Sequence, residues 1–502
     1  MLYNTTGYYN TAVGANVAQA NTTGQQNVAM GSGALFANTT GNYNTAIGHA
    51  ALETNTTADG NTAVGQASLY ANTTGASNTA VGDRALTANT TGIYNVAVGY
   101  QALDANTTGD QNIAIGAHAL GANTTSDNNT AVGYSALWKT TGNHNTGVGY
   151  NVLGENTTGA QNTSVGTNSL DANTTGGQNT AVGEGALSAN TTANNNTAVG
   201  QEALKANTTG TSLVAIGKEA LSENTTASGN VACGYKALTQ NTTGANNTAV
   251  GNHALDANTT GNATVSIGRH SLSNQTTGTQ NTAVGYNALL ANTTGANNTS
   301  IGYQSGENVT TGSYNVFLGY LCGDYGTTIT TGAGNTLLGA YANSSAVDAN
   351  YETCIGYNAT GGGSNTFRVV ASSGVYNTQN TSAWQTTSDR RIKKNIVDNT
   401  TGLDKINQLR VRNFEYRKPE EIDYSEFAEG VNSESIPVDK EGIQLGVIAQ
   451  EIAEVLPDVV ETQSTGVKTV DPDNITWYLV NAVKELSAEN TALKARLDAA
   501  GI

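Results

Sequence analysis

One short stretch, Ser-Asp-Arg-Arg-Ile-Lys-Lys at residues 388–394, places a hydroxyl group close to several cationic side chains. A serine hydroxyl becomes a nucleophile when a base takes its proton, and a neutral lysine amine serves as such a base. No histidine follows His270, which excludes a serine–histidine pair within this part of the chain. The surrounding like charges disfavour the charged form of Lys393. Taken alone, the stretch is more typical of a solvated basic loop.

The same stretch divides two kinds of sequence. All four prolines, and 14 of the 21 lysines and arginines, lie from Ser388 onward, whereas 53 of the 59 glycines lie before Ser388. Such a change in composition marks a domain boundary. We therefore divide the chain into a repeat region (1–360), a β-rich connector (361–387) and a C-terminal domain (388–502).

Charge and composition exclude several kinds of partner. The net charge is -17, from about -10 before Ser388 (7 basic, 17 acidic) and -7 after it (14 basic, 21 acidic). Neither part has a basic stripe, so we expect no nucleic-acid partner. No apolar run is long enough to span a membrane, and the first residues show no signal peptide, so we expect synthesis in the cytosol and no membrane insertion.

The repeat region repeats the unit Asn-Thr-Ala-Val-Gly-x-x-Ala-Leu-x-Ala-Asn-Thr-Thr-Gly-x-x. An anchor glycine recurs every 17 residues, with one step of 16, at these positions: Gly14, Gly31, Gly48, Gly65, Gly82, Gly99, Gly116, Gly133, Gly149, Gly166, Gly183, Gly200, Gly217, Gly234, Gly251, Gly268, Gly285, Gly302 and Gly319. A short fixed period predicts a solenoid or stacked fibre, because one unit cannot bury its own apolar side. The next anchor, Gly339, follows after 20 residues, and we expect a change of cross-section there.

Each unit predicts one coil with two short strands. Thr-Ala-Val alternates its faces like a strand, Ala-Leu supplies a second apolar contact, and Asn-Thr-Thr-Gly is typical of a turn. The fold class is thus mainly β, a β-solenoid or β-roll-like fibre. Because each unit has few apolar residues, we expect an intertwined homotrimer rather than a lone solenoid. The repeats resemble, loosely, the heads of trimeric autotransporter adhesins.

Other functions of the repeats have little support. Three scattered cysteines (Cys233, Cys322, Cys354) and five scattered histidines form no metal-ligand set, so we expect no metal and no cofactor. The sequons recur because the turn recurs, which disfavours glycosylation, and the repeats favour neither an ice-binding threonine ladder nor calcium-binding repeats, which need regularly spaced aspartates. Acidic residues do not cluster in the sequence, which disfavours a glycan-cleaving site.

The C-terminal domain has two further signals. The run Gly446-Val447-Ile448-Ala449-Gln450-Glu451-Ile452 leads into an apolar segment that suits a helix ending at Pro457. Near the C-terminus, apolar residues alternate in steps of four and three, which predicts a coiled-coil seam with one polar position: Leu479, Val483, Leu486, Asn490, Leu493 and Leu497. The alternative is an amphipathic helix packed on its own domain.

Together these features resemble the intramolecular chaperone domain of phage tail spikes and fibres, the peptidase S74 family. The resemblance covers residues 388–502 and implies a small α+β domain that trimerises, registers the preceding fibre and releases itself by self-cleavage. It implies Ser388 as cleavage-site serine, Lys393 as its base, and Ser388–Asp389 as the scissile bond, with Thr387–Ser388 left open. The family's histidine two residues before the motif glycine is Gln444 here.

The resemblance implies a tail-fibre or tail-spike protein of a virion, made in the host cytoplasm, that attaches to a host surface. The expected partners are two further copies, a host receptor or glycan, and other tail proteins. We expect autoproteolysis only, with no turnover of an external substrate. Nearly identical coils can pair one step out of register at little cost, which explains the need for a C-terminal clamp. The alternatives are a bacterial surface adhesin and a glycan depolymerase tail spike.

Overall fold

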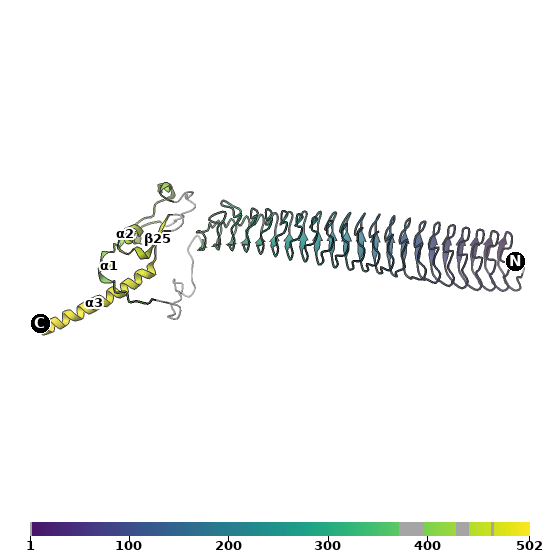
Figure 1. The fold of residues 1–502 in the computed structure, drawn as a ribbon, viewed down its shortest axis with the longest axis horizontal. Helices are drawn as coiled ribbons and strands as arrows, with labels where there is room; N and C mark the ends of the chain where they lie inside the picture. Colours follow the sequence, from purple (N-terminus) through teal and green to yellow (C-terminus); the bar gives the residue numbers. More distant parts are fainter. Residues whose placement is uncertain (1–2, 371–394, 428–440, 463–465, 502) are drawn as a thin grey trace. The chain divides into compact units, whose positions relative to one another are not determined.

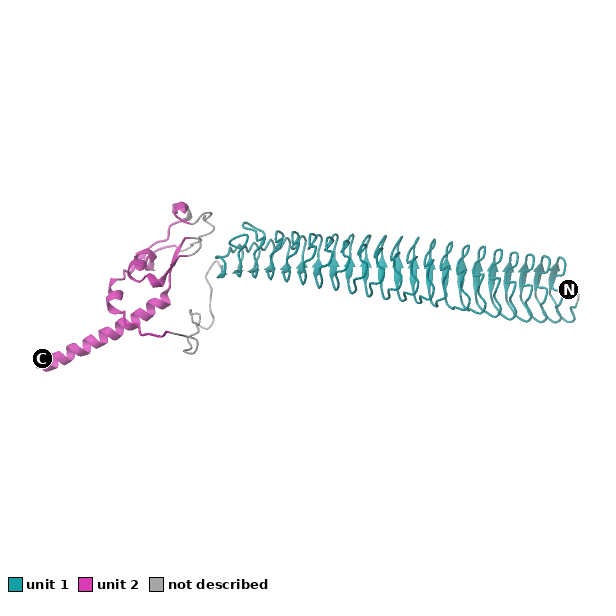
Figure 2. Cartoon of the chain, viewed as in Figure 1, with its two compact units in different colours: residues 1–371 teal, residues 372–502 magenta. Residues whose placement is uncertain are grey.

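The computed structural model describes residues 3–370, 395–427, 441–462 and 466–501. It divides into two compact units, residues 1–371 and 372–502 (Figure 2). In the described residues the first unit is built from short strands and turns, and the second carries the helices (Figure 1).

The first unit is a β-solenoid in which each coil contributes one three-residue strand. The strands form one 22-stranded sheet, as predicted for the fold class. They are β1 (Thr11–Val13), β2 (Val28–Met30), β3 (Thr45–Ile47), β4 (Thr62–Val64), β5 (Thr79–Val81), β6 (Val96–Val98), β7 (Ile113–Ile115), β8 (Thr130–Val132), β9 (Thr146–Val148), β10 (Thr163–Val165), β11 (Thr180–Val182), β12 (Thr197–Val199), β13 (Val214–Ile216), β14 (Val231–Cys233), β15 (Thr248–Val250), β16 (Val265–Ile267), β17 (Thr282–Val284), β18 (Thr299–Ile301), β19 (Val316–Leu318), β20 (Thr336–Leu338), β21 (Thr353–Ile355) and β22 (Phe367–Val369).

Each strand pairs in parallel with the strand of the next coil. Val96 lies opposite Ile113, for example, one repeat further along. The 20-residue step does not interrupt the sheet, because Val316 lies opposite Thr336 in the same parallel register. Equivalent residues of successive coils therefore lie in columns along the solenoid, and every repeated side chain meets its own counterpart.

The core of each coil is made by alanine and leucine. The middle strand residue Ala97 and the pair Ala102 and Leu103 are fully buried, whereas the flanking Val96 and Val98 face outward. One chain thus buries these residues completely. Each coil closes on itself and stacks on its neighbours, so these residues are already buried in one chain. The homotrimer expected from the small apolar content stays a prediction.

Two coils show how tightly this narrow core is filled. Gly147 replaces the middle alanine of β9, and Val152 fills the space, since a Cβ on Gly147 would lie 3.1 Å from a Val152 methyl group. Phe317 replaces the middle alanine of β19, and Gly306 and Gly323 stand where other coils have leucine. Close packing requires the volume added at one position to be removed at another.

The second predicted strand of each coil does not form. In its place Gln101 and Leu103 adopt left-handed backbone angles, with φ of 52° and 54°. A left-handed residue with a side chain costs on the order of 1 kcal/mol. Complete burial of Leu103 and a 2.9 Å hydrogen bond from its backbone nitrogen to the oxygen of Ala119 offset this cost.

The anchor glycine is required by the turn that follows each strand. Gly99 has φ of 135°, and a Cβ there would lie 2.7 Å from the carbonyl carbon of Gly116 in the next coil. Any larger residue would clash with the backbone above it and strain its own backbone.

Two columns of asparagine are buried in the solenoid, and only the column from Asn-Thr-Thr-Gly was predicted, as a turn residue. In one column Asn106 donates from Nδ2 to Oδ1 of Asn89, at 2.9 Å. In the other, Asn95 donates from Nδ2 to the oxygen of Gly109, at 2.8 Å, and accepts the backbone N–H of Asn112. Buried amides that satisfy one another in this way stabilise the stacking of coils.

The second unit is a small α+β domain, as predicted. Its described elements are α1 (Leu403–Gln408), β23 (Arg412–Phe414), η2 (Pro419–Glu421), η3 (Tyr424–Glu426), β24 (Gln444–Gly446), α2 (Ala449–Val455), η4 (Pro457–Val459), β25 (Val460–Thr462), β26 (Lys468–Val470) and α3 (Pro472–Ala500). Strands β23 and β24 pair antiparallel, as do β25 and β26. The buried core consists of Ile452, Leu456 and Val459.

Candidate functional site

The residues predicted to carry the cleavage chemistry lie outside the described residues. Ser388, Asp389 and Lys393 belong to the segment 371–394, so the structure does not test their geometry. The description of the site therefore rests on the elements that follow this segment, from Asn395 onward.

The motif at residues 446–452 joins the β23–β24 sheet to helix α2. Strand β24 ends at Gly446 and α2 begins at Ala449. Within the motif, Glu451 accepts two hydrogen bonds from Arg412 on β23, from Nη2 at 2.8 Å and from Nε at 3.2 Å. The hydrogen bonds from Arg412 hold the pKa of Glu451 below its usual range. Ile452 then points into the core, so the motif supports the domain's fold.

Gln444, which stands where the family has histidine, lies on β24 opposite Phe414. Its Nε2 donates to the backbone oxygens of Glu441 and Gly442, at 3.3 and 3.2 Å. The amide therefore closes the turn that precedes its own strand.

Helix α3 is held to the domain along one face of its first half. It begins at Pro472, and Asp471 caps it by accepting the backbone N–H of Asp473 at 2.9 Å. The Tyr478 hydroxyl donates to the Asp458 carboxylate at 2.6 Å. This contact raises the pKa of Tyr478.

The start of α1 packs directly on the same face of α3. The Glu485 carboxylate accepts the backbone N–H of Leu403 at 2.8 Å, and the Asn481 amide donates to the backbone oxygen of Asn399 at 2.7 Å. Between them, Gly402 lies so close to α3 that a Cβ there would be 2.6 Å from the carbonyl carbon of Asn481. The alternative of a helix packed on its own domain thus holds for this face.

The predicted seam lies on a different face of α3, which is exposed in the single chain. Leu479, Val483, Leu486, Asn490, Leu493 and Leu497 are all exposed, and Val483 is 59% exposed. Trimerisation along this face stays a prediction. An apolar seam left open on a long helix is typical of a surface that packs against another helix.

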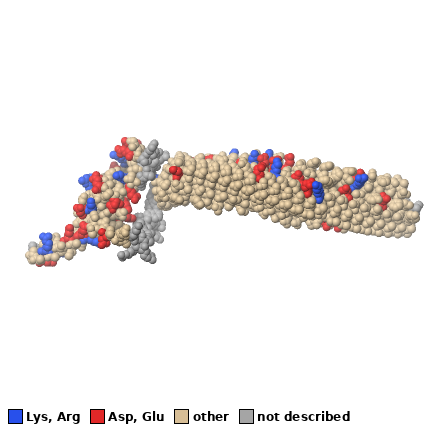
Figure 3. All heavy atoms as spheres, in the orientation of Figure 1, with Lys and Arg blue, Asp and Glu red and all other residues tan. Residues whose placement is uncertain are grey.

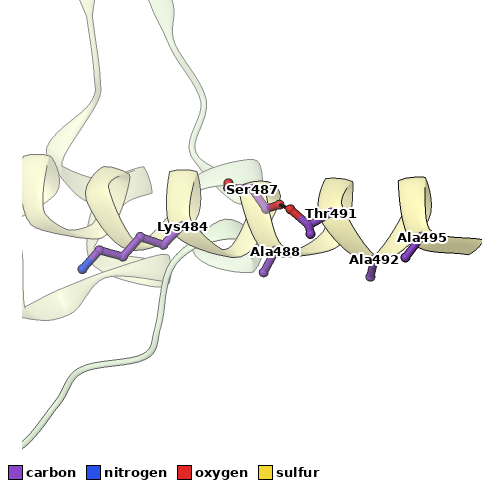
Figure 4. A pocket seen from close by; sticks show the side chains of 6 residues that line it. All are labelled: Lys484, Ser487, Ala488, Thr491, Ala492 and Ala495. Carbon is purple, nitrogen blue, oxygen red and sulfur yellow. Dashed lines mark hydrogen bonds between the residues drawn. The ribbon is translucent and has the colours of Figure 1, made fainter.

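A shallow surface of small side chains lies on another side of the same helix. It is lined by Lys484, Ser487, Ala488, Thr491, Ala492 and Ala495 (Figure 4). Thr491 donates to the backbone oxygen of Ser487 at 2.8 Å, so its hydroxyl is already used within the helix. This surface has one ionisable group, Lys484, and no pair of groups for acid–base chemistry.

Comparison with known families bears directly on this unit. Residues 388–461 match the family model Peptidase_S74, described as chaperone of endosialidase. The C-terminal unit contains a Peptidase_S74 chaperone domain. The match begins at Ser388 and ends within β25, so helix α3 lies beyond it. No curated protein and no solved structure matched the chain.

The chaperone domain exposes many large apolar side chains in addition to the seam. Val397, Val411, Ile443, Leu445 and Trp477 are each more than half exposed. Monomeric soluble domains seldom leave so much apolar surface uncovered relative to so small a core. The chaperone domain therefore has the surface expected of a subunit in an assembly.

The solenoid carries a row of aromatic side chains that the sequence analysis did not identify. Tyr286, Tyr303 and Tyr320 stack in successive coils with ring centroids 5.2 and 5.3 Å apart. Tyr341 and Tyr357 continue the row through edge-to-face contacts at 5.4 and 5.8 Å. We call these five residues the tyrosine ridge. The available signal was tyrosine recurring directly after the anchor glycine, at Tyr286, Tyr303, Tyr320 and Tyr357.

The structure also brings together two carboxyl groups that are distant in sequence. Burial, together with the nearby Glu307, raises the pKa of Asp324 to about 6. Glu307 accepts hydrogen bonds from Asn287 at 2.7 Å and from Gln304 at 2.6 Å, and Asn308 donates to Asp324. Acidic residues that do not cluster in the sequence therefore come close here, because coil stacking aligns positions 17 residues apart.

The described residues also bear on metal sites, membrane-spanning helices and reactive thiols. No group of three or more histidine, cysteine or acidic side chains is placed to hold a metal ion there. None of the helices in those segments combines the length and hydropathy needed to cross a membrane. Burial raises the pKa of Cys322 to about 12 and that of Cys354 to about 11, so both thiols stay protonated at neutral pH.

Proposed function

We propose that the chain is a phage tail-fibre or tail-spike protein whose C-terminal domain trimerises it, sets its register and then releases itself. One observation carries the proposal. A solenoid of nearly identical coils precedes a Peptidase_S74 chaperone domain in the same polypeptide. In this arrangement the C-terminal chaperone domain trimerises and registers the solenoid that precedes it in the chain.

The solenoid explains why a chaperone is useful. Within one chain, covalent connection fixes which coil stacks on which. Between chains, equivalent columns repeat every coil, so a neighbouring chain can pair one coil out of step with little loss. A domain that first joins the C-terminal ends of the chains sets their register. The exposed seam of α3 is the surface available for this contact.

Self-cleavage removes the clamp once the fibre is assembled. Lys393 accepts the proton of the attacking hydroxyl or water, and the new amine leaves protonated. In one route Ser388 Oγ attacks the carbonyl of Thr387 through a five-membered ring, and water hydrolyses the ester. In the other, water positioned by the Ser388 hydroxyl cuts the Ser388–Asp389 bond. Release of the domain leaves a fibre that is stable kinetically.

The fibre itself attaches the virion to a host surface and joins other tail proteins. The tyrosine ridge supports this role, since exposed aromatic side chains that also bear hydroxyl groups are frequent in recognition surfaces. The ligand in this proposal is a host receptor or glycan.

The intact masses of the wild type, Ser388→Ala and Ser382→Ala test the cleavage. We expect a released fragment from the wild type and from the Ser382→Ala control, and full-length protein alone from Ser388→Ala. The first residue of the fragment, Ser388 or Asp389, identifies the bond. If all three proteins stay full length, the domain is a clamp that does not cleave.

A glycan depolymerase remains a second candidate because of the Glu307–Asp324 pair. Glycosidases use two carboxyl groups, one of which has a raised pKa and acts as the general acid. Both residues already bond to neighbouring amides, and the simple attachment function needs no catalysis. Release of reducing ends from host polysaccharide, abolished in Asp324→Asn, would favour the depolymerase. A bacterial surface adhesin is the third alternative.

A further inference from the structure

The outward side of the solenoid sheet is a continuous uncharged face. In strands β1–β21 the first residue is threonine, valine or isoleucine, and the third is valine, isoleucine, leucine, methionine or cysteine. We call these outward residues the strand face. Most of the first unit's surface in view is uncharged, and its charged side chains form a few separate groups (Figure 3).

The strand face is exposed in the single chain. Ile216 is 42% exposed, and Ile267 and Ile301 are each 39% exposed, whereas the alanine between the outward residues is buried in nearly every coil. At a strand spacing of about 4.8 Å, the 21 coils extend this surface over on the order of 100 Å. The third strand residues are apolar in every one of these coils, and a monomeric protein seldom exposes an apolar row of that length.

We propose that two further copies of this chain cover the strand face, parallel and in register with the first. This inference rests on the trimeric fibre proposed above and identifies the surface that holds its shaft together. The tyrosine ridge follows the strand beyond the anchor glycine, outside the strand face, and so stays available to a host ligand.

Three features favour another copy as the partner. Its coils have the same spacing, so side chains interlock over the whole length, which a partner of different period cannot do. The face has no charge, so it offers an unlike partner no electrostatic recognition. The coiled coil proposed for the exposed seam of α3 would bring the C-terminal ends of parallel chains together. An ordered surface such as ice fits less well, because valine or isoleucine repeatedly replaces threonine in the first column.

The native chain contains a reporter for this packing. Cys233 is the third residue of β14 and is partly exposed on the strand face. Cys322 and Cys354 are buried, and their raised pKa values keep them unreactive. Three chains in register bring their Cys233 residues to the same level, within reach of a short bismaleimide.

The first experiment cross-links the intact full-length protein. We expect linked chains from the wild type and none from Cys233→Ser. A second control, Cys233→Ser with Thr243→Cys, places the thiol on the outer turn and should also give no links. Coexpressed wild type and Cys233→Ser/Ile267→Cys chains test register. Their thiols lie two coils apart when aligned, so mixed links should be at least tenfold rarer than like links.

The second experiment places charge on the face and measures mass by light scattering. For the wild-type solenoid, after release of the chaperone domain, we expect the mass of three chains. For the solenoid of Val250→Lys/Ile267→Lys/Val284→Lys/Ile301→Lys we expect the mass of one chain. The matched control adds the same charge in nearby turns, as Thr243→Lys/Thr260→Lys/Thr277→Lys/Thr294→Lys, and should remain trimeric. Circular dichroism of the isolated species checks that each variant keeps its β structure, as expected for outward side chains.

The outcomes separate this inference from the proposed function. A trimer that persists in the face variant and lacks Cys233 links overturns the assignment of the face but leaves the trimeric fibre intact. A monomeric wild type overturns both. Frequent mixed links, or a shaft of antiparallel chains, overturn the in-register arrangement alone.

Discussion

The side-chain nitrogen of Asn106 lies 2.9 Å from the side-chain oxygen of Asn89 in the preceding coil and 3.0 Å from the backbone oxygen of Gly109 in its own. Asn123 donates in turn to Asn106 at 3.0 Å. One amide thus links three consecutive coils and closes a turn, in a position with no access to water.

Replacing Asn106 by alanine should therefore loosen the solenoid locally. It leaves buried partners above and below unsatisfied, each at a cost of about 1–3 kcal/mol. Because coils unfold semi-independently, the measurement is hydrogen exchange of the amides around this coil. Thr108→Ala, an exposed change in the same turn, should alter exchange little. Equal protection in both variants would contradict a structural role for the ladder.

Lys393→Ala should abolish self-cleavage, whereas Lys394→Ala should retain it. Loss of a general base slows a reaction by about 100-fold or more. Because the base acts in its neutral form, the wild-type cleavage rate should rise with pH until Lys393 is deprotonated. The measurement is the fraction of full-length chain over time. A Lys393→Ala protein that cleaves at the wild-type rate would remove Lys393 from the mechanism.

Gly402→Ala should destabilise the chaperone domain, because the added methyl group overlaps the backbone of α3 at Asn481. Overpacking of this kind costs about 1–3 kcal/mol. Thermal unfolding of the chaperone domain within the full chain gives the measurement. The neighbouring Thr401→Ala, at an exposed position, is the control and should leave the midpoint unchanged within error.

Charged side chains placed in the seam of α3 should prevent trimerisation. Leu486→Lys/Leu493→Lys places two ammonium groups on the exposed apolar face, so we expect the uncleaved Ser388→Ala protein to lose its trimer. Ala488→Lys/Ala495→Lys adds the same charge on the small-residue surface of Figure 4, away from the seam, and should assemble normally. Light scattering distinguishes the two, and equal masses would argue against the coiled coil.

Asp324 should make the coil around it less stable as the pH rises. Burial raises its pKa in the folded state from 3.8 to about 6, so the folded state holds this proton more tightly than the unfolded state. The stability of the wild type relative to Asp324→Asn is therefore greatest below pH 4 and falls between pH 4 and 6. Hydrogen exchange near β19 and β20 measures the difference, and a flat difference across this window would contradict the shifted pKa.

The sequence by itself determined the period, the position of the Thr-Ala-Val strands, the need for glycine after each strand and the two-part organisation of the chain. These follow from local rules, since a repeated strand and turn impose a repeated coil. The start at Ser388, the motif at residues 446–452 and the C-terminal helix pattern together indicated the family that the C-terminal unit matches.

Only the tertiary structure decided which side of each strand is buried. Alternation gives Val96 and Val98 one face and Ala97 the other, but it does not say that the smaller residue lies inside. The coil is too narrow for more than Ala97, Ala102 and Leu103, so the valines face outward. For the same reason Asn89 and Asn106 are buried: parallel stacking places identical amides one coil apart, where each satisfies the next.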